Sequence, residues 1–344
     1  MRIGFACKYV HPDQSLPKKH LKEIEGRYNM RSTTATRCRN DPDWQDLLWE
    51  IAEHNAQCII NLVEYVSSLP KMAHMVRISS DVLPLYTHVE FQHFYKRKDV
   101  RTMLAKCLAP AGQLARDKDI RLSFHPGQFC VLASDRPDVV ENSILEFEYH
   151  TDVAKYMGYC KSFQDFKCNV HLSGKGGVEQ FRKTFKKLSP EARNILTIEN
   201  DEYSAGLDYV LFVSDIVPIV LDIHHNWINT GNYIRPSDPR VRQVLDSWQG
   251  KRPTMHYSYS REEVLLSAGH KCKYTNPNMD KLLKRGAVSG KLRAHSDFYP
   301  NVSANRWALS FLPEFDIMCE SKMKNLASLE LIEFYRSIHA SNAT

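Results

Sequence analysis

Short apolar runs recur along the chain, and each has the length and composition of a β-strand. Most are four to seven residues long and rich in Ile, Val, Leu, Phe and Met, which is typical of strands buried on both faces. They occupy residues 2–6, 74–79, 120–124, 166–172, 194–200, 217–223, 252–258 and 314–321.

Longer segments with apolar residues at helical spacing lie between most of these strands. The first, residues 41–69, repeats apolar positions every three or four residues, and Asp41-Pro42 predicts its start. Further helices are predicted at 99–118, 137–159, 177–188, 204–216, 236–248 and 322–340.

Eight strands that alternate with helices predict parallel βα units. We therefore expect an α/β fold, a single (β/α)8 TIM barrel that fills residues 1–344 as one domain. A long excursion at residues 257–313 separates the seventh and eighth strands. The Gly-rich SGKGG at 173–177 lacks the full spacing of a phosphate-binding loop, so it is interpreted as a strand-to-helix turn.

Seven of the strands lead to a potential metal ligand at or soon after their C-terminal end. Side chains at that end of a parallel barrel converge on one place, so the pattern predicts a metal cluster at the barrel mouth. Carboxylates that follow apolar strands, such as Glu199 and Asp222, are the strongest candidates because a buried acid needs a partner. The seven ligands are His88, His125, His171, Glu199, Asp222, His256 and Glu320, and His224, His225 and His295 add further imidazoles.

The composition indicates an ordinary globular protein. Hydrophobic residues make up 43% and charged residues 25% of the chain. Nine cysteines with no CxxC pair favour reduced thiols over a disulfide framework or a thiolate zinc site. The opening MRIGFACKYV is too short and polar for a signal peptide, and no apolar stretch reaches the length of a membrane span. We therefore expect a cytoplasmic protein.

Positive charge is concentrated in two stretches. Residues 11–40 hold seven Lys or Arg against three acids, and residues 257–299 hold eight against four, so each carries +4 while the whole chain carries +6. Both stretches are interpreted as loops at the rim of the active site. Basic loops there suggest a polyanion such as DNA, although the charge alone slightly favours a solvated surface with no partner.

A cluster of imidazole and carboxylate ligands suits two chemistries. One is phosphodiester hydrolysis, and the other is sugar isomerisation or epimerisation, in which metals polarise a carbonyl. The basic loops favour the phosphodiester. A nucleic-acid-binding barrel without catalysis is a third alternative, which the full set of ligands argues against.

Several motifs resemble those of the UV damage endonucleases, which are TIM-barrel relatives of the endonuclease IV-type AP endonucleases. The motifs are TTATR (33–37), FHPGQF (124–129), VHLSG (170–174), IENDE (198–202), LDIHH (221–225), RAHSD (293–297) and CESK (319–322). The resemblance implies a DNA repair endonuclease that nicks damaged double-stranded DNA on the 5′ side of UV photoproducts and some other lesions. It also implies two or three divalent ions, Mn, Zn or Mg, and no obligate protein partner. An AP endonuclease-like phosphodiesterase with a different lesion remains an alternative.

The resemblance also implies roles for individual ligands. One ion would be held by His125, His171 and Glu199, and a second would share Glu199 and add Asp222, His256 and Glu320. A third would use His225 and His295, with His88 beside the cluster and His224 ambiguous. Some relatives add a Lys to the third site where this chain has Thr254. The catalytic residues implied are Glu199, Glu320 and Lys322, the last as a phosphate contact.

Two residues of the FHPGQF motif, Gln128 and Phe129, correspond to the pair that probes the damaged duplex. A planar aromatic ring there can stack where nucleotides have flipped out, whereas the alternative for Phe129 is packing in the core. The remaining residues expected to contact DNA are Phe5, Tyr9, Arg37, Lys281, Lys284 and Arg285.

Overall fold

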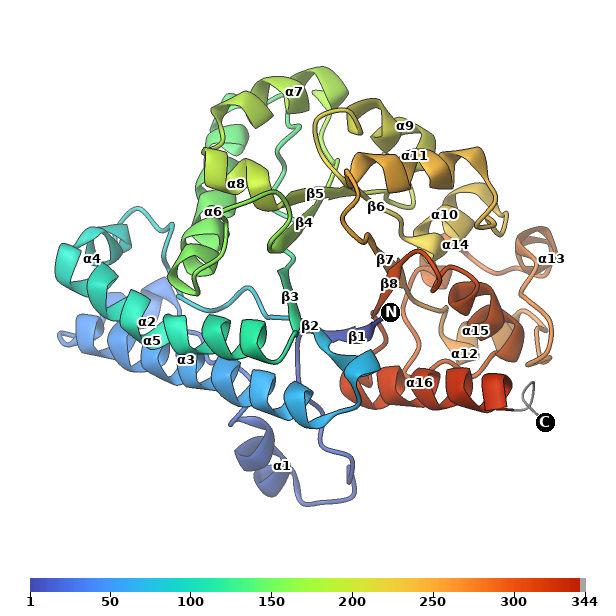
Figure 1. Cartoon of the computed structure of the whole chain (residues 1–344), viewed down its shortest axis with the longest axis horizontal. Coiled ribbons are helices and arrows are strands. Elements are labelled where there is room, and N and C mark those ends of the chain that lie inside the picture. Colours follow the sequence, from blue (N-terminus) through green and yellow to red (C-terminus); the bar gives the residue numbers. More distant parts are fainter. Residues whose placement is uncertain (341–344) are drawn as a thin grey trace.

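The centre of the molecule is a ring of eight parallel strands, seen end-on in Figure 1. The structure is a computed structural model that describes residues 1–340. The strands are β1 (Ile3–Ala6), β2 (Met75–Arg77), β3 (Arg121–Phe124), β4 (Lys167–His171), β5 (Leu196–Glu199), β6 (Ile219–Val220), β7 (Thr254–Tyr257) and β8 (Asp316–Cys319). All eight predicted strands are therefore present.

Neighbouring strands pair in parallel in the order β6-β5-β4-β3-β2-β1-β8-β7. The gap between the two ends of this order is joined by an isolated parallel bridge between Asp222 and His256. The strands thus form a nearly closed barrel, and the predicted TIM-barrel fold class is confirmed.

Helices surround the barrel on the outside (Figure 1). Six predicted helices are present within a few residues of their expected bounds, and the 204–216 segment forms only the short α9 and η2. The outer helices are α3 (Trp44–Ser68), η1 (Lys71–Ala73), α4 (Gln92–Lys96), α5 (Lys98–Asp117), α6 (Pro137–Tyr156), α7 (Gly177–Lys187), α8 (Pro190–Ile195), α9 (Leu207–Val210), η2 (Leu211–Val213), α10 (Ile223–Thr230), α11 (Pro239–Ser247) and α16 (Lys324–Ala340).

The two basic stretches contain helices, so the interpretation of both as loops was wrong. The first holds α1 (Lys18–Glu25) and α2 (Ala35–Arg39). The excursion between β7 and β8 holds α12 (Glu262–Ser267), α13 (Met279–Lys284), α14 (Ser289–Leu292) and α15 (Val302–Leu309). These helices have four to eight residues, too few for a clear helical period in the sequence. In the described part of the chain, no helix is long and apolar enough to cross a bilayer.

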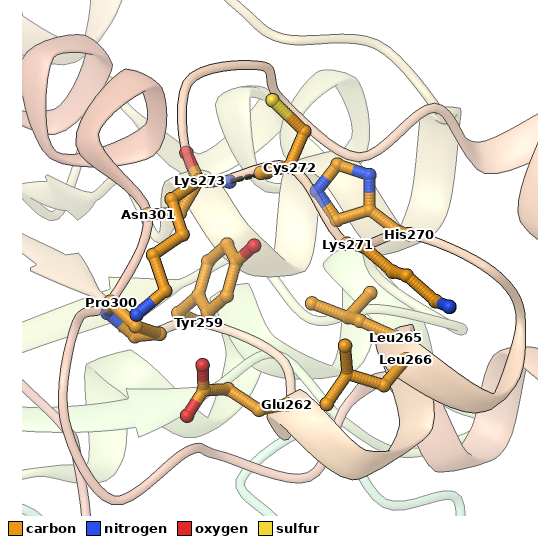
Figure 2. Close-up of a pocket in the computed structure, with 10 residues that line it drawn as sticks. All are labelled: Tyr259, Glu262, Leu265, Leu266, His270, Lys271, Cys272, Lys273, Pro300 and Asn301. Atoms are coloured by element: carbon orange, nitrogen blue, oxygen red, sulfur yellow. Dashed lines mark hydrogen bonds between the residues drawn. The ribbon is translucent and has the colours of Figure 1, made fainter.

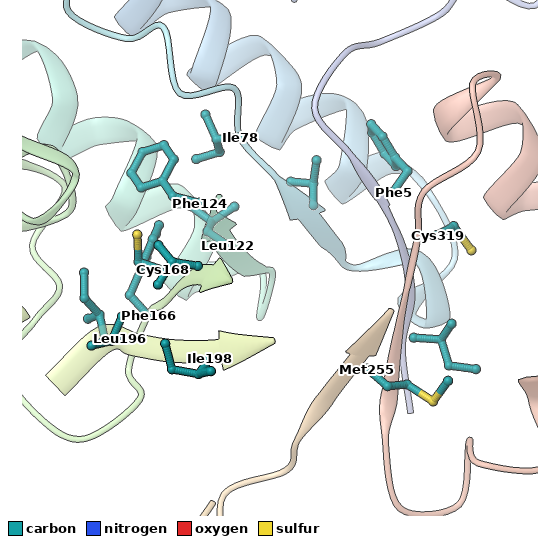
Figure 3. Close-up of a cluster of buried hydrophobic side chains, with 14 of the residues drawn as sticks. Phe5, Ile78, Leu122, Phe124, Phe166, Cys168, Leu196, Ile198, Met255 and Cys319 are labelled. Atoms are coloured by element: carbon teal, nitrogen blue, oxygen red, sulfur yellow. The ribbon is translucent and has the colours of Figure 1, made fainter. Parts of the chain in front are cut away.

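The apolar core lies between the barrel and the surrounding helices. Figure 3 shows part of it, including Phe124, Phe166, Cys168 and Leu196. Because side chains alternate along a strand, the other face of each strand points into the barrel. On β4 this inner face carries polar groups, since Asn169 reaches Glu199 on β5. The interior of this barrel is therefore partly filled by polar and charged side chains.

A buried ionic network occupies the barrel near the N-terminal ends of the strands. The Asp316 side chain has no exposed surface and lies 3.0 Å from Arg121, 2.8 Å from Arg252 and 3.5 Å from Arg2, measured between carboxylate and guanidinium atoms. Burial by itself would raise the pKa of Asp316, but Arg121 and Arg252 outweigh it and hold that pKa below its ordinary value. One carboxylate thus gathers three arginines from three strands or their ends.

We expect Asp316→Asn to destabilise the protein by about 3–5 kcal/mol, because three arginines lose a buried counter-charge. Urea unfolding at pH 7 measures this loss. The depressed pKa means that the stabilisation by Asp316 is present above the ordinary value of 3.8 and is lost as pH falls below it. The difference between wild type and variant should therefore shrink in acid. Asp119→Asn is the control, because Asp119 also pairs with Arg2 but its side chain is 87% exposed. Equal losses in both variants would contradict this account.

Candidate metal centre

Seven predicted ligands converge at the mouth of the barrel. His171 and Glu199 end their strands, and His256 lies in β7. His125 and Glu320 directly follow β3 and β8, and Asp222 and His225 come shortly after β6. They form groups whose ligand atoms all lie within 4.8 Å of one another. The three groups are His125, His171 and Glu199; Glu199, Asp222 and His225; and Asp222, His256 and Glu320. The first has the same members as the first predicted ion site.

Glu199 occupies the middle of the cluster. One carboxylate oxygen lies 3.3 Å from Nε2 of His125, and the other lies 3.0 Å from Nδ1 of His256. Asn169 on the neighbouring strand donates to Oε2 of Glu199 and fixes its orientation. Burial alone would raise the pKa of Glu199, but His256 and His171 bring it well below its ordinary value. The side chain is therefore an ionised carboxylate between two groups of ligands.

Asp222 is positioned by a helix end as well as by the barrel. It is the N-cap of α10, and its Oδ1 accepts a hydrogen bond of 2.7 Å from the backbone N–H of His225. Its other oxygen, Oδ2, is buried and has no hydrogen-bond partner within the described residues. The same is true of Nδ1 of His171. Buried polar atoms normally have partners, so these two free atoms fit the ligand set of a cation.

Two buried basic residues accompany the ligands, and the strand pattern did not identify them. Arg77, at the end of β2, forms an ion pair with Glu320. Nζ of Lys167 lies 3.1 Å from Nε2 of His256. Burial disfavours the ammonium and lowers the pKa of Lys167 to about 7, despite the nearby carboxylate of Glu199. The sequence signal for both was a basic residue in an apolar strand, at a position whose side chain points into the barrel.

Burial of several carboxylates side by side works against the ionisation of Asp222. Burial, together with Glu199, raises the pKa of Asp222 well above its ordinary value, although His225 opposes this. For His225, burial acts against the charged form, but Asp222 and Glu199 raise its pKa to about 9. Both shifts favour a proton on this pair, and binding of a divalent ion by Asp222 and His225 should release it.

The other predicted imidazoles differ in their surroundings. His225 and His295 line the same cavity as His171 and Glu320, and Nδ1 of His295 is 2.6 Å from the backbone oxygen of Glu320. His224 is buried, and its two ring nitrogens hydrogen-bond to Ser258 and Ser260 at 2.9 and 3.1 Å. This arrangement gives His224 a structural role and resolves the ambiguity of the LDIHH motif.

That His88 lies beside the cluster stays a prediction. Its ring packs on Phe91 with a centroid distance of 5.2 Å, and its Nδ1 accepts a hydrogen bond from the backbone N–H of Glu90. It belongs to none of the ligand groups found in the described residues. His88 follows the end of β2 by eleven residues, so the strand end does not fix its position.

A cavity of about 390 Å³ opens over the cluster. Its walls come from the loops after β3, β4 and β5 and from the excursion after β7. A smaller cavity of about 160 Å³, shown in Figure 2, lies within the excursion and is lined by Tyr259, His270 and Cys272 among others. None of the clustered ligands lines the smaller cavity, so the larger one is the candidate substrate site.

The turn after His125 presents two side chains to solvent. Gln128 is exposed and lines the large cavity, and Phe129 is 84% exposed. A backbone hydrogen bond of 3.0 Å from the N–H of Cys130 to Gly127 closes the turn. The exposed ring of Phe129 excludes the core-packing alternative for this residue.

Two other residues expected to contact DNA are buried. Phe5 is 1% and Tyr9 is 8% exposed, and both belong to the apolar core. Phe5 points outward from β1 towards the helices, and Tyr9 packs between Tyr28 and Tyr65. Their expected contact with DNA is therefore not supported. Arg37, Lys281, Lys284, Arg285 and Lys322 are exposed, as the prediction requires, and Nζ of Lys322 lies 3.9 Å from Asp297.

Comparisons with known proteins agree on one family. A family model described as UV-endonuclease UvdE matches residues 1–343. A UV DNA damage endonuclease from Bacillus mycoides is 27% identical over 304 residues, which cover 84% of this chain and 83% of that protein. Among solved structures, SacUVDE superposes with a TM-score of 0.74 at 23% identity over 98% of this chain and 99% of the other. Endonuclease IV from Thermus thermophilus shares the fold, with a TM-score of 0.51 at 13% identity over 81% and 93% of the two chains.

The pairing of Arg77 with Glu320 predicts a cation-dependent stability. Arg77→Met should lower the stability of the metal-free protein by about 3–5 kcal/mol, because Glu320 is left buried without a counter-charge. A bound divalent ion supplies that charge, so the deficit should narrow when Mn²⁺ is added. Thermal melts in EDTA and in Mn²⁺ measure both states. Arg39→Met, which breaks an exposed pair with Glu90, is the control. A deficit of the same size in both conditions would argue against the account.

Proposed function

Because the chain belongs to the UV-endonuclease UvdE family, we propose that it hydrolyses a phosphodiester on the 5′ side of UV photoproducts and some other lesions in double-stranded DNA. Members of this family are DNA endonucleases, a class of hydrolase, and this chain is one of them. The observation that carries the proposal is the position of Glu199, which belongs to two groups of potential metal ligands, and two other members of these groups, His171 and His225, line an open cavity.

Two or three divalent ions, of Mn, Zn or Mg, fit the ligands present. His125, His171 and Glu199 would hold one, and Asp222, His256 and Glu320 would hold another. His225 and His295 are available for a third, without a lysine at position 254, where the chain has a buried Thr254. Such ions would supply Lewis-acid stabilisation of the charge that develops on the phosphate during hydrolysis.

The protein's own residues would orient the substrate and hold the charge of the site. Arg77 pairs with Glu320, and Lys167, beside His256, is close enough to Glu199 for the two charges to interact. Asn169 keeps Glu199 aimed at the cavity. Lys322, exposed at the end of the CESK motif, would contact a phosphate of the bound strand.

Recognition of DNA would fall to the rim. Phe129 is exposed on a closed turn beside the ligands, where an aromatic ring can enter a gap in a damaged duplex. Gln128 stands next to it in the cavity wall. Arg37, Lys281, Lys284 and Arg285 would add contacts to phosphates, each of which makes binding weaker as salt rises.

The rival sugar-isomerase reading has no support from the family assignment. A direct comparison of substrates identifies the lesion. Nicking of duplexes that differ only in carrying a photoproduct, an abasic site or no lesion would rank the substrates. Preference for the abasic duplex would favour an AP endonuclease-type activity, and cleavage at the 3′ side would contradict the proposed polarity.

Glu199→Ala should abolish nicking, because the variant loses a ligand shared by two groups. Bound metal, measured by mass spectrometry on the purified protein, should fall together with the activity. Glu314→Ala, an exposed acid on the barrel exterior, is the matched control and should keep both. Wild-type nicking in the Glu199 variant, whatever its metal content, would contradict the assignment of Glu199 as a metal ligand that cleavage requires.

Phe129→Ala should weaken binding to a photoproduct-containing duplex by roughly 5- to 150-fold, the value of about 1–3 kcal/mol for one lost base stack. Its melting temperature should not change, since the ring is 84% exposed. Phe212→Ala removes another exposed ring, outside the cavity, and should bind as wild type does. Unaltered affinity for the damaged duplex in the Phe129 variant would rule out the probing role.

A further inference from the structure

A second exposed aromatic residue stands at the candidate substrate site. Tyr203 is 55% exposed and lines the same cavity as Gln128, His171 and His225. It lies in the loop after β5, whereas Gln128 lies in the loop after β3, so the two residues belong to different walls.

The loop that carries Tyr203 is held in one conformation by Asp201. Oδ1 of Asp201 accepts hydrogen bonds from the backbone N–H groups of Tyr203, Ser204 and Ala205 at 2.7, 2.6 and 2.9 Å. Oδ2 accepts a further one of 2.6 Å from the Ser204 hydroxyl. The N–H of Asp201 closes the loop onto the carbonyl of Ala205 at 2.8 Å. A fixed loop has already lost the entropy that binding would otherwise cost, which favours a contact residue at its tip.

Arg293 covers one side of the tyrosine ring. Its guanidinium carbon lies 5.5 Å from the ring centroid, and its Nε is 3.0 Å from Oε1 of Glu202. Glu202 is in turn 3.7 Å, through Oε2, from Nε2 of His225. Glu202, which belongs to the same IENDE motif as Glu199, therefore holds the guanidinium of Arg293 in place. Arg293 lines the cavity in which the DNA backbone would lie if the protein cleaves DNA.

We propose that Tyr203, backed by Arg293, stacks against a nucleobase of the bound strand and positions that strand over the metal centre. The proposal rests on the proposed DNA endonuclease function and adds a contact on a different wall from Phe129. Aromatic rings accept any base on their faces, so this contact would be insensitive to sequence. A cation beside the ring strengthens it and attracts the backbone. Tyr203 would thus act on the position of the strand and leave the ligands untouched.

The test compares Tyr203→Ala with Tyr203→Phe in the full-length, metal-loaded protein. The alanine variant should show a Kd and KM for a photoproduct-containing duplex that are raised about 5- to 150-fold. The phenylalanine variant keeps the ring and should stay close to wild type. Bound metal and melting temperature should be unchanged in both, because the residue is exposed and holds no ligand. Phe212→Ala again serves as the control for loss of an exposed ring.

A direct readout of stacking uses 2-aminopurine, whose fluorescence falls when it stacks. Duplexes that carry it at successive positions near the lesion should include one position where wild type and Tyr203→Phe quench the signal and Tyr203→Ala does not. Wild-type affinity in the alanine variant would overturn the proposal, as would a phenylalanine variant as weak as the alanine one. If the wild-type protein itself neither bound nor nicked the damaged duplex, the proposed function would fail instead, which separates the two outcomes.

Discussion

Buried negative charge is the constraint on which the architecture of this barrel depends. Glu199, Asp222 and Glu320 meet at the barrel mouth with little or no exposure to water, and such carboxylates are costly unless cations accompany them. Arg77 and Lys167 provide part of that charge from inside the barrel. Among the imidazoles, His225 provides more, because Asp222 and Glu199 raise its pKa to about 9. At the opposite end of the barrel, cations outnumber the buried carboxylate, since three arginines surround Asp316. The strands enclose a column of compensated charge where many barrels have layers of aliphatic side chains.

The IENDE motif shows how much of the site one short segment organises. Glu199 is the shared ligand, and Asn200 exchanges hydrogen bonds of 2.9 and 3.0 Å with the backbone of Asp222, which ties β5 to the next ligand. Asp201 shapes the loop, and Glu202 links His225 to Arg293. Consecutive residues can serve such different purposes because the strand ends here, so their side chains leave it in different directions.

The sequence predicted the fold and the clustered ligands because both follow from a simple regularity. Strands of a parallel barrel end on one face, so a ligand at a strand end has its position fixed by topology. The positions of residues farther from a strand end do not follow from topology. His88 comes eleven residues after β2, and Tyr9 packs in an aromatic cluster. Arg77 and Lys167 were missed because alternation shows that a residue points inward but not which strand it will meet. The exposure of Phe129 depended on a turn whose direction the sequence leaves open.

The contact between β6 and β7 is the least extensive strand pairing in the described barrel. Elsewhere the barrel is held by runs of paired residues, but in the described structure β6 and β7 are joined by the bridge between Asp222 and His256 and by one backbone hydrogen bond from the N–H of His256 to Leu221. Both bridge residues belong to the same group of potential ligands. A cation bound by Asp222 and His256 would link β6 to β7 where the barrel has the fewest paired residues. Binding of the ion and closure of the barrel would then depend on the same few side-chain and backbone atoms.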